Sequence, residues 1–558
     1  MPVSKTEELE LSKIFRDGQY AFLVGAGISR DAPAYLESAK EFSEVLIDYF
    51  SPPTEKSDLL KLLRYELIIQ VLYEAIDRDF HFLDYLESKI TPNLIHFFLA
   101  NVIAKKNFVI TTNFDFFIEY ALLKVISDPN KVDVIITKED FSRLLDPNEI
   151  YNMGRFPLVK IHGSIKDILK KRDTRETLVT TLGHLGKYRK QGETFALEEF
   201  KKKPVTNILK NRILVVMGYS GSDDFDLNPT LKDIKTLKGL IWIDHIQSTE
   251  GSIKIQRIEE GFNSNLKKMA SCDSLLVEIA LNNSFSVYKI SINTMQFIKN
   301  YLWDKFLSTI PIPKLDGICN SVTKIDLASW LKQNFQETPL LNKYNFVYDL
   351  YFYAGMEKKA YRCATAAYNV ATNQQNKKER AKWLNDQAHY FYKRKKWKQS
   401  EIKLREALPI YSEIKDIRGT AMVLQNLGET LSNMKKWHEA VKYFEEAMIN
   451  YDKIDNFHGK ALVCNNLGLL LTRNKQWEDA FIFYKRALSF YEQLGDLDGK
   501  ARVLNNLGML YARKGEFGLA KECIKEAVAI VESVGMGTTR SAKRYRRNLS
   551  LVSRNICP

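Results

Sequence analysis

The fold of the first half of the chain is decided by the stretch Ala21-Phe22-Leu23-Val24-Gly25-Ala26-Gly27-Ile28-Ser29-Arg30. Its apolar start is typical of a buried strand, which runs directly into a Gly-x-Gly turn. Glycines permit a tight turn and a close approach of a ligand to the backbone amides, and a following helix favours an anion there. The stretch predicts a phosphate-binding loop, although an ordinary strand-to-helix turn fits the same residues. Arg30 stands where the usual dinucleotide fingerprint has its third glycine, which argues against a simple dehydrogenase domain.

Further apolar runs of strand length follow this loop, and helical stretches separate them, one of which covers residues 36–104. The runs are residues 108–110, 158–161, 213–217 and 240–243. Strands that alternate with helices predict a parallel sheet covered on both faces, with ligands bound at the carboxyl ends of its strands. Asn113, His162 and Gly218 each follow such a run, as Gly25 follows the first. Each residue alone fits a helix cap or a polar turn, but the four together predict one cleft.

Four short motifs stand at these strand ends: Gly25-Ala26-Gly27-Ile28-Ser29, Thr112-Asn113-Phe114-Asp115, His162-Gly163 and Gly218-Tyr219-Ser220. In this order and spacing they resemble the sirtuin-like domain. They look like its glycine motif, its Asn-x-Asp motif, its catalytic His-Gly and its late nucleotide-binding loop. The resemblance covers roughly residues 10–285 and implies an α/β fold with a Rossmann-like parallel sheet.

The sirtuin family binds NAD⁺ and cleaves the bond between nicotinamide and ribose, so the resemblance implies NAD⁺ as the substrate. It implies that Asn113 orients a water or hydroxyl near the ribose, that Asp115 contacts the nicotinamide end and that His162 is the general base. Cleavage through an oxocarbenium-like state needs orientation and a base of suitable pKa more than a strong acid. The implied nucleotide-binding residues are Gly25, Ala26, Gly27, Ser29, Thr112, Gly218, Ser220 and Asp244.

The chain departs from the protein-deacylating members of the family in its cysteines. Those members hold zinc with four cysteines between the His-Gly motif and the late nucleotide loop. The six cysteines here are at 272, 319, 363, 464, 523 and 557, so none lies between His162 and Gly218. We therefore expect no metal site and a place in the zinc-free bacterial branch, whose members hydrolyse NAD⁺, often in antiphage defence. Residues 166–203, with His184, take the place of the zinc module and are interpreted as a solvated helical insertion.

The second half of the chain repeats itself every 40 residues. Asn-Leu-Gly recurs at 426–428, 466–468 and 506–508, and an aromatic residue recurs at 437, 477 and 517. Alanine recurs at 440, 480 and 520 and again at 447, 487 and 527. The pattern resembles the tetratricopeptide repeat in a 40-residue form, with small residues where paired helices pack closely. It predicts an all-α superhelix of about five units over residues 340–539, whose concave surface binds a protein or peptide.

Three further features of the second half carry predictions. The asparagines at 426, 466 and 506 are either ligand contacts on the concave face or structural polar groups between helices. Residues 286–339 are expected to form a helical connector after a first domain of residues 1–285. The basic end, residues 540–558, is expected to be a capping helix or tail, with an acidic or nucleic-acid partner as the alternative.

Composition sets the wider limits. The chain has 558 residues, enough for two or three domains, and its 45% hydrophobic and 27% charged residues are typical of a soluble globular protein. We see no signal-peptide pattern and no apolar run near the ~20 residues that span a bilayer, so we expect a cytoplasmic protein without membrane contact. The net charge of +14 permits a nucleic-acid partner but does not favour one.

These observations predict a two-part effector of antiphage defence. Its first domain is an NAD⁺ hydrolase that depletes cellular NAD⁺, causing abortive infection, when the repeats sense a protein or peptide trigger from the phage or the cell. A homo-oligomer is expected, because repeat arrays also pair subunits. The alternatives are a zinc-free protein deacylase or ADP-ribosyltransferase, and a repeat scaffold with an inert nucleotide-binding domain. The presence of Asn113, Asp115 and His162 together argues against the inert domain.

Overall fold

The computed structural model describes residues 5–55, 63, 65–179, 197–221, 227–247, 253–258, 271–315, 325–335, 337–533 and 540–557. The chain divides into two compact units. The first takes in residues 1–50, 63–189 and 195–338, and the second takes in residues 51–62, 190–194 and 339–558. His184, part of the predicted insertion, lies outside the described residues.

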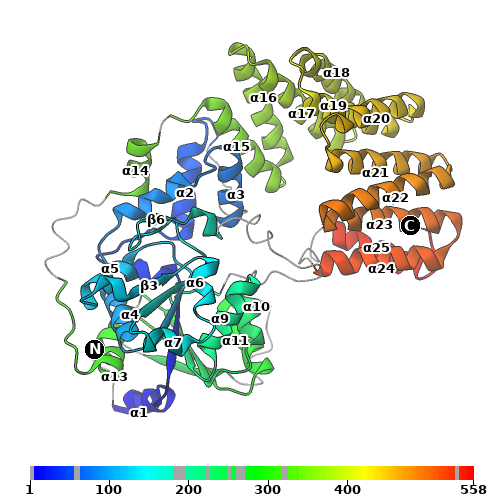
Figure 1. Ribbon diagram of the computed structural model, residues 1–558. Helices are drawn as coiled ribbons and strands as arrows, with labels where there is room; N and C mark the ends of the chain where they lie inside the picture. Colours follow the sequence, from blue (N-terminus) through cyan, green and yellow to red (C-terminus); the bar gives the residue numbers. More distant parts are fainter. Residues whose placement is uncertain are drawn as a thin grey trace. The chain divides into compact units, whose positions relative to one another are not determined.

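An eight-stranded sheet forms the centre of the first unit, in the order β3-β4-β2-β1-β7-β8-β10-β9 (Figure 1). Neighbouring strands are parallel except β9 and β10, which are antiparallel. In β1, Leu23 lies beside Ile110 of β2 and Val216 of β7. The strands are β1 (Tyr20–Val24), β2 (Phe108–Thr111), β3 (Val132–Ile135), β4 (Phe156–Lys160), β7 (Ile213–Met217), β8 (Gly239–His245), β9 (Lys254–Ile258) and β10 (Val287–Ile292). The predicted α/β fold is confirmed.

Helices cover both faces of this sheet, and β1 is buried between them. Phe22 and Val24 belong to one hydrophobic core and Ala21 and Leu23 to the other, as the alternation along a strand requires. The first core takes side chains from α1 (Lys5–Ile14), α4 (Leu94–Ala104), α5 (Phe117–Val125), α12 (Thr294–Phe297), η7 (Ile298–Leu302) and α13 (Trp303–Leu307). The second takes side chains from α6 (Lys138–Ser142), α7 (Pro147–Asn152), α9 (Glu199–Leu209), α10 (Leu227–Asp233) and α11 (Ser271–Asn282).

A group of helices with aromatic contacts completes the first unit. It comprises α2 (Ala39–Phe50), α3 (Tyr65–Ala75), the 3₁₀ helix η3 (His81–Ser88) and α14 (Leu327–Asn334). The ring of Phe42 lies 6.1 Å from that of Phe82 and 6.2 Å from that of Tyr85. The Tyr85 hydroxyl donates to the Glu37 carboxylate at 2.6 Å, which gives this buried polar group a partner.

The predicted helical connector over residues 286–339 is wrong at its start. Residues 287–292 form β10, which pairs with β8 on one side and β9 on the other. Val287, Ile290 and Ile292 are buried, while Lys289 reaches the carboxylates of Asp244 and Asp273. The sheet therefore extends beyond residue 285, and the first unit ends at Thr338.

The prediction of a helical insertion is also wrong for residues 166–179. Here β5 (Lys166–Asp167) and β6 (Arg172–Asp173) form an antiparallel hairpin, and the short 3₁₀ helix η5 (Arg175–Thr177) follows. The Asp167 carboxylate accepts hydrogen bonds from the amides of Leu169 and Lys170, each at 3.1 Å. A side chain that bonds to the backbone two and three residues ahead stabilises a turn in place of a helix.

The second unit is a row of paired helices that pack in sequence order, as the repeat pattern predicts. They are α15 (Leu340–Tyr353), α16 (Glu357–Asn373), α17 (Lys377–Lys393), α18 (Trp397–Glu413), α19 (Ile417–Asn433), α20 (Trp437–Asp452), α21 (Phe457–Arg473), α22 (Trp477–Leu494), α23 (Leu497–Lys514) and α24 (Phe517–Ser533). After them α25 (Arg540–Val552) packs on α24 and α23 through the buried Ala542, Tyr545 and Val552. The predicted all-α repeat fold is confirmed.

The 40-residue period has a packing explanation. In each repeat the first helix is α17, α19, α21 or α23, and the second helix is α18, α20, α22 or α24. A buried tyrosine near the end of one repeat's second helix lies against a glycine near the start of the following repeat's first helix. The pairs are Tyr411–Gly419, Tyr451–Gly459 and Tyr491–Gly499. A Cβ on Gly459 would lie only 2.4 Å from the Tyr451 ring. The first helices also share a cap, because Asn376, Asp416, Asn456 and Asp496 accept a backbone N–H in their first turn.

All three candidate ligand asparagines have structural partners, and Asn466 Oδ1 accepts from Asn465 Nδ2 at 3.4 Å. The Asn426 carboxamide donates to Asn385 Oδ1 at 2.8 Å, and that of Asn506 donates to Asn465 Oδ1 at 2.9 Å. Each of these last two bonds joins successive first helices, so these side chains satisfy one another inside the array. The Asn548 side chain of α25 donates to Asn505 Oδ1 at 3.0 Å and extends the same pattern to the end of the chain.

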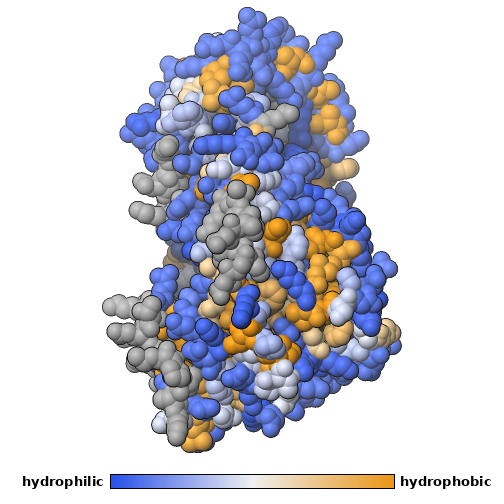
Figure 2. All heavy atoms as spheres, turned by 90° about the vertical axis from the view of Figure 1, so that its left-hand side faces the viewer, coloured by the Kyte–Doolittle hydropathy of each residue, from blue (hydrophilic) through white to orange (hydrophobic). Residues whose placement is uncertain are grey.

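Within the described residues, no helix has both the length and the apolar character of a membrane span. The face drawn in Figure 2 is mostly hydrophilic, and its hydrophobic side chains gather in local groups.

We predict that Gly459→Ala destabilises the repeat array by about 1–3 kcal/mol, because the added methyl overlaps the buried ring of Tyr451. Thermal unfolding of the full chain measures this as a lower midpoint. The control is Gly518→Ala in α24, where an added Cβ meets nothing within 4 Å and alanine favours the helix. Equal midpoints for the two variants would contradict the packing explanation.

Candidate active site

The loops after β1, β2, β4 and β7 meet at the carboxyl edge of the sheet, where a cleft of about 430 Å³ opens. Its walls are formed by Ala26, Gly27, Arg30, Ser38, Ala39, Tyr65, Thr112, Phe114, His162, Val179, Gly218, Tyr219 and Ser220. Because these strands are parallel, the loops that follow them all leave from the same edge of the sheet. The predicted convergence of the four strand ends is therefore present in the structure.

The glycines of two loops are required by a backbone-to-backbone contact. A Cβ on Gly25 would lie 2.7 Å from the Gly218 carbonyl oxygen, and a Cβ on Gly27 would lie 2.8 Å from the Gly218 Cα. Gly218 has a φ of +64°, a left-handed conformation that favours glycine. The Gly25 amide donates to Met217 O at 3.1 Å and the Gly27 amide donates to Gly218 O at 2.9 Å. These two amides therefore serve the contact between loops, and not the anion cradle that the sequence predicts.

A buried hydrogen-bond network lies at the strand ends and joins Ser29, Asn113 and Asp115. These residues are 0%, 5% and 4% exposed. The Ser29 hydroxyl donates to Asp115 Oδ2 at 2.9 Å, and Asn113 Nδ2 donates to the same oxygen at 3.1 Å. The Phe117 amide donates to Asp115 Oδ1 at 3.3 Å. The carboxylate therefore has donors on both oxygens, as burial of such a group demands.

His96 of α4 extends this network and was not predicted. Its Nδ1 accepts the Asn93 amide at 3.0 Å in a capping box, and its Nε2 lies 3.1 Å from Ser29 Oγ. Burial lowers the pKa of His96 to about 3, so the ring is neutral. Because Nδ1 accepts from an N–H, the single ring proton is assigned to Nε2, which donates to Ser29.

Two properties of the network point to chemistry. Burial raises the pKa of Asp115 above its ordinary value, although the charge of Lys160 and the hydrogen bond from Ser29 oppose the rise. Among the described residues, the Oδ1 atom of Asn113 is buried without a hydrogen-bond partner. A buried carbonyl oxygen without a donor costs roughly 1–3 kcal/mol, so this atom is a natural acceptor for a bound ligand or water.

A buried ion pair ties this network to β4. Lys160 donates to Glu119 Oε1 at 2.7 Å and to the Asp115 carbonyl at 2.8 Å, and both ionic side chains are almost fully buried. Its ammonium also lies 4.9 Å from the centre of the Phe116 ring. Since Lys160 comes two residues before His162, the pair couples the loop of Asn113 to the loop of the histidine.

His162 is half-buried and lies on the wall of the cleft. The backbone carbonyl of His162 accepts a hydrogen bond from the Val179 amide at 2.9 Å. This bond holds the end of the hairpin segment beside His162. The next residue, Gly163, has a φ of +83°, and a Cβ there would lie 2.2 Å from the Thr177 carbonyl. The hairpin segment therefore fixes the backbone at the histidine.

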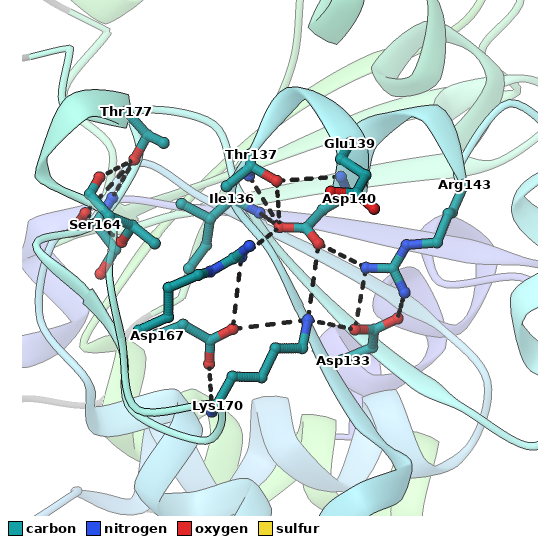
Figure 3. Close-up of polar contacts among 12 residues, drawn as sticks. Asp133, Ile136, Thr137, Glu139, Asp140, Arg143, Ser164, Asp167, Lys170 and Thr177 are labelled. Carbon is teal, nitrogen blue, oxygen red and sulfur yellow. Dashed lines mark hydrogen bonds and ion pairs between the residues drawn. The ribbon is translucent and has the colours of Figure 1, made fainter.

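Ion pairs hold the hairpin itself against β3 and α6 (Figure 3). The buried Asp133 pairs with Arg143 at 2.6 Å, and the Lys170 ammonium lies 3.4 Å from Asp133 and 3.7 Å from Asp167. Burial disfavours the charge of Asp140, yet hydrogen bonds from Thr137 lower its pKa to about 2. The Asp140 carboxylate therefore remains charged at neutral pH, and the ion pairs anchor the segment that carries Thr177.

The predicted site residues thus fall into four groups. Ala26, Gly27, Thr112, His162, Gly218 and Ser220 line the cleft. Gly25 belongs to the loop contact, while Ser29, Asn113 and Asp115 form the buried network. Asp244 is not among the lining residues, because its carboxylate pairs with Lys289 at 3.1 Å and accepts from Ser291 at 3.2 Å. We therefore separate Asp244 from the candidate site.

A larger hollow of about 1100 Å³ lies between α6, η5 and α9 and shares Val179 with the cleft. Tyr73, Phe80 and Phe200 contribute to its walls, and acidic and basic side chains alternate around it. It contains none of the predicted site residues, so we place the candidate site in the smaller cleft, where the strand ends meet. Among the described residues, no group of three or more histidine, cysteine, aspartate or glutamate side chains is arranged to hold a metal.

Comparison with family models identifies both parts of the chain. Residues 107–257 match the SIR2-like domain, and residues 379–453, 419–493 and 458–533 match the tetratricopeptide repeat. The chain joins a SIR2-like domain to tetratricopeptide repeats. The SIR2-like match indicates an NAD-dependent enzyme and includes Asn113, Asp115 and His162. No curated protein matches the chain.

Several solved structures share a distant likeness. BtubC (BKLC) from P. vanneervenii is 23% identical, with 36% of this chain and 82% of that chain covered and a TM-score of 0.31. A Rap protein complexed with competence and sporulation factor is 17% identical, with coverage of 46% and 68% and a TM-score of 0.34. Aspartyl phosphate phosphatase F from Bacillus subtilis is 18% identical, with coverage of 46% and 67% and a TM-score of 0.33. TM-scores this low support no conclusion about function.

We predict that His96 makes the protein lose stability in acid. An unfolded histidine takes up a proton near pH 6.5, whereas the folded ring does so only near a pKa of about 3. The unfolded state therefore binds more protons between these values, and the free energy of unfolding falls as pH falls, by up to ~1.4 kcal/mol per pH unit. His96→Gln removes this contribution, which thermal unfolding between about pH 7 and 4.5 measures. His458→Gln, at a histidine with 55% exposed side chain, is the control. Identical pH dependence in wild type and His96→Gln would contradict the neutral buried ring.

Proposed function

We propose that the SIR2-like domain hydrolyses NAD⁺ to nicotinamide and ADP-ribose in the cleft. Two observations carry the proposal: His162 lies on the cleft wall, and at the end of the neighbouring strand β2 the buried Oδ1 of Asn113 lacks a donor among the described residues. The SIR2-like match across both residues supports it. Histidine is a common general base in enzymes that work near neutral pH.

The proposed reaction breaks the C–N bond between nicotinamide and ribose and forms a C–O bond to water. Nicotinamide leaves as a neutral molecule and keeps the electron pair of the broken bond, so no protein acid is needed. His162 takes the proton that the attacking water loses. Asn113 accepts a hydrogen bond from that water through Oδ1, and Asp115 lowers the energy of positive charge on the ribose.

The nucleotide contacts are assigned to the residues on the cleft wall. Ala26 and Gly27 are exposed there, and the Arg30 guanidinium is 40% exposed while paired with Glu41. Arg30 supplies positive charge for the pyrophosphate, and Thr112 and Ser220 supply hydroxyl groups. Ser29 acts below the cleft, through Asp115, and does not contact the nucleotide.

The test is incubation of the purified full-length chain with NAD⁺ and identification of the products by mass spectrometry. Nicotinamide and ADP-ribose are expected in equal amounts. NAD⁺ that stays intact even at high protein concentration and long incubation, where a resting enzyme that is ~1% active still cleaves it, overturns the proposal. Cleavage that depends on an added acyl-peptide identifies a deacylase, and transfer of ADP-ribose to protein identifies a transferase.

We predict that Asn113→Ala and His162→Ala each reduce nicotinamide release by a factor on the order of 10²–10⁴. Loss of a positioned base or of the group that orients water acts on the transition state and leaves the fold intact. His458→Ala, at an exposed histidine of the second unit, is the control and keeps wild-type activity. Near-wild-type turnover in a folded Asn113→Ala or His162→Ala protein would refute the assignment.

We predict no stoichiometric zinc in the purified protein and no loss of NAD⁺ cleavage after chelation. The sequence has no cysteine between residues 162 and 218, so a four-cysteine site cannot form there. Elemental analysis of the protein measures the metal content directly. One tightly held zinc ion per chain would contradict this and support the deacylase alternative.

We further propose that the repeats control the enzyme in antiphage defence and that they bind a protein or peptide trigger. A hollow of about 190 Å³ opens between α17, α18 and α19, where His389, Tyr392 and Lys393 reach its wall. A trigger activates the enzyme only if it binds the active arrangement more tightly than the resting one. A change from ~1% to ~99% active needs roughly 5.5 kcal/mol of such preference.

We predict that Lys393→Glu, Arg473→Glu and Arg513→Glu together prevent NAD⁺ loss after phage challenge. These exposed cations lie in the last turns of α17, α21 and α23 at equivalent positions of the 40-residue repeat, and so share one side of the array. Lys442→Glu with Lys485→Glu, on the second helices α20 and α22, is the control and keeps the response. Cellular NAD⁺ is measured before and after challenge. A normal response in the triple variant would exclude this side as the sensor.

A further inference from the structure

We propose that His96 is a positioning residue for Asn113. Its neutral ring donates from Nε2 to Ser29 and thereby directs the Ser29 proton to Asp115, the carboxylate that also holds Asn113 Nδ2. The inference rests on the proposed function, because Asn113 is there assigned to orient the attacking water. His96 itself contacts neither the cleft nor a ligand and acts through Ser29.

The donor and acceptor of each hydrogen bond in this chain follow from the Asn93 amide, which can only donate. His96 Nδ1 therefore accepts, and Nε2 carries the proton. The Nε2–H then occupies a lone pair of Ser29 Oγ at 3.1 Å, and the Ser29 proton goes to Asp115 Oδ2 at 2.9 Å. The same carboxylate oxygen attracts Asn113 Nδ2 at 3.1 Å.

The last bond decides which end of the Asn113 carboxamide faces a ligand. With Nδ2 held by Asp115, the oxygen Oδ1 is left as the acceptor that has no donor among the described residues. If the carboxamide turned over, its oxygen would face the carboxylate, a repulsive contact between two acceptors. The chain from His96 therefore keeps the acceptor of Asn113 available for a water that must donate to it.

Among the described residues, one other side chain donates to Ser29: Asn113 Nδ2 lies 3.4 Å from Ser29 Oγ, farther than the 3.1 Å of His96 Nε2. His96 is 0% exposed, so solvent does not reach Ser29 from that side. The other face of the histidine contacts the Phe117 ring at 5.0 Å, which has no N–H or O–H. The Lys160 ammonium donates to Glu119 and to the Asp115 carbonyl, and not to Ser29.

Three replacements separate this role from the capping of α4. Glutamine keeps both an acceptor for the Asn93 amide and an N–H donor for Ser29, and it is a usual residue at this position of a capping box. Glutamate keeps the cap but provides no donor when ionised, and leucine provides neither group. Ser29→Ala removes the middle link and leaves the His96 cap untouched.

The experiment measures kcat and KM for NAD⁺ cleavage by the full-length chain and these variants, with thermal midpoints alongside. We expect His96→Gln to stay close to wild type. We expect His96→Glu, His96→Leu and Ser29→Ala to lose roughly 10- to 100-fold in kcat with little change in KM. The double variant His96→Leu with Ser29→Ala should lose no more than the single ones, because both break one chain.

A purely structural role gives a different pattern. Activity would then follow the thermal midpoint, so the capped variants His96→Glu and Ser29→Ala would match His96→Gln, and that result overturns the proposal. If His96→Glu does not fold, the double-mutant cycle of His96→Leu and Ser29→Ala decides the question. Losses in kcat that add in the double variant overturn the proposal.

A second measurement separates this inference from the proposed function. NMR of the chain with ¹⁵N-labelled histidine should show His96 protonated at Nε2, bare at Nδ1 and unchanged between about pH 5 and 9. A wild-type chain that releases no nicotinamide overturns the proposed function, whatever the ring shows. A ring protonated at Nδ1, or one that titrates in this range, overturns the positioning role even if NAD⁺ is cleaved.

Discussion

A carboxylate without access to solvent is stable only if the protein supplies hydrogen-bond donors and compensating charge, and Asp115 imposes this requirement on the first unit. Its donors come from the loop after β1, the loop after β2 and the start of α5. Lys160 brings positive charge from β4. Segments far apart in the sequence are thus brought together by the solvation of one group. The same group leaves Asn113 with a free acceptor, so stability and chemistry share a single cause.

The contact between the loops after β1 and β7 depends on the backbone instead of on charge. Gly25, Gly27 and Gly218 let two loops touch through main-chain atoms, and the amides of the first two are used in that contact. The loop after β1 is therefore a rigid wall before any ligand binds. A loop that is already ordered loses little conformational entropy when a ligand binds. This favours a site that must hold its substrate in one orientation.

Much of this arrangement could be predicted from the sequence, because strand patterns and the rule for parallel sheets act over short distances in the chain. Asn113 and His162 were found at strand ends for that reason. His96, Glu119 and Lys160 were missed, since each looks like an isolated polar residue in an apolar helix or strand and only the folded chain shows its partners. The sequence holds a weak signal for His96, because Asn93 and His96 have the spacing of a helix capping box. The strand β10 was missed because its mixed pattern of Val-Tyr-Lys-Ile-Ser-Ile forms a strand only between its neighbours.

The regular spacing of the second unit has a consequence for how such a protein changes over evolutionary time. Each tyrosine–glycine contact, like the bonds that Asn426 and Asn506 donate, joins helices in adjacent repeats. Duplication or deletion of one whole 40-residue unit by recombination therefore recreates the same joints at its new borders. A lineage can lengthen, shorten or exchange its recognition surface in single steps while the buried carboxylate network, encoded in a separate stretch of the gene, is inherited unaltered.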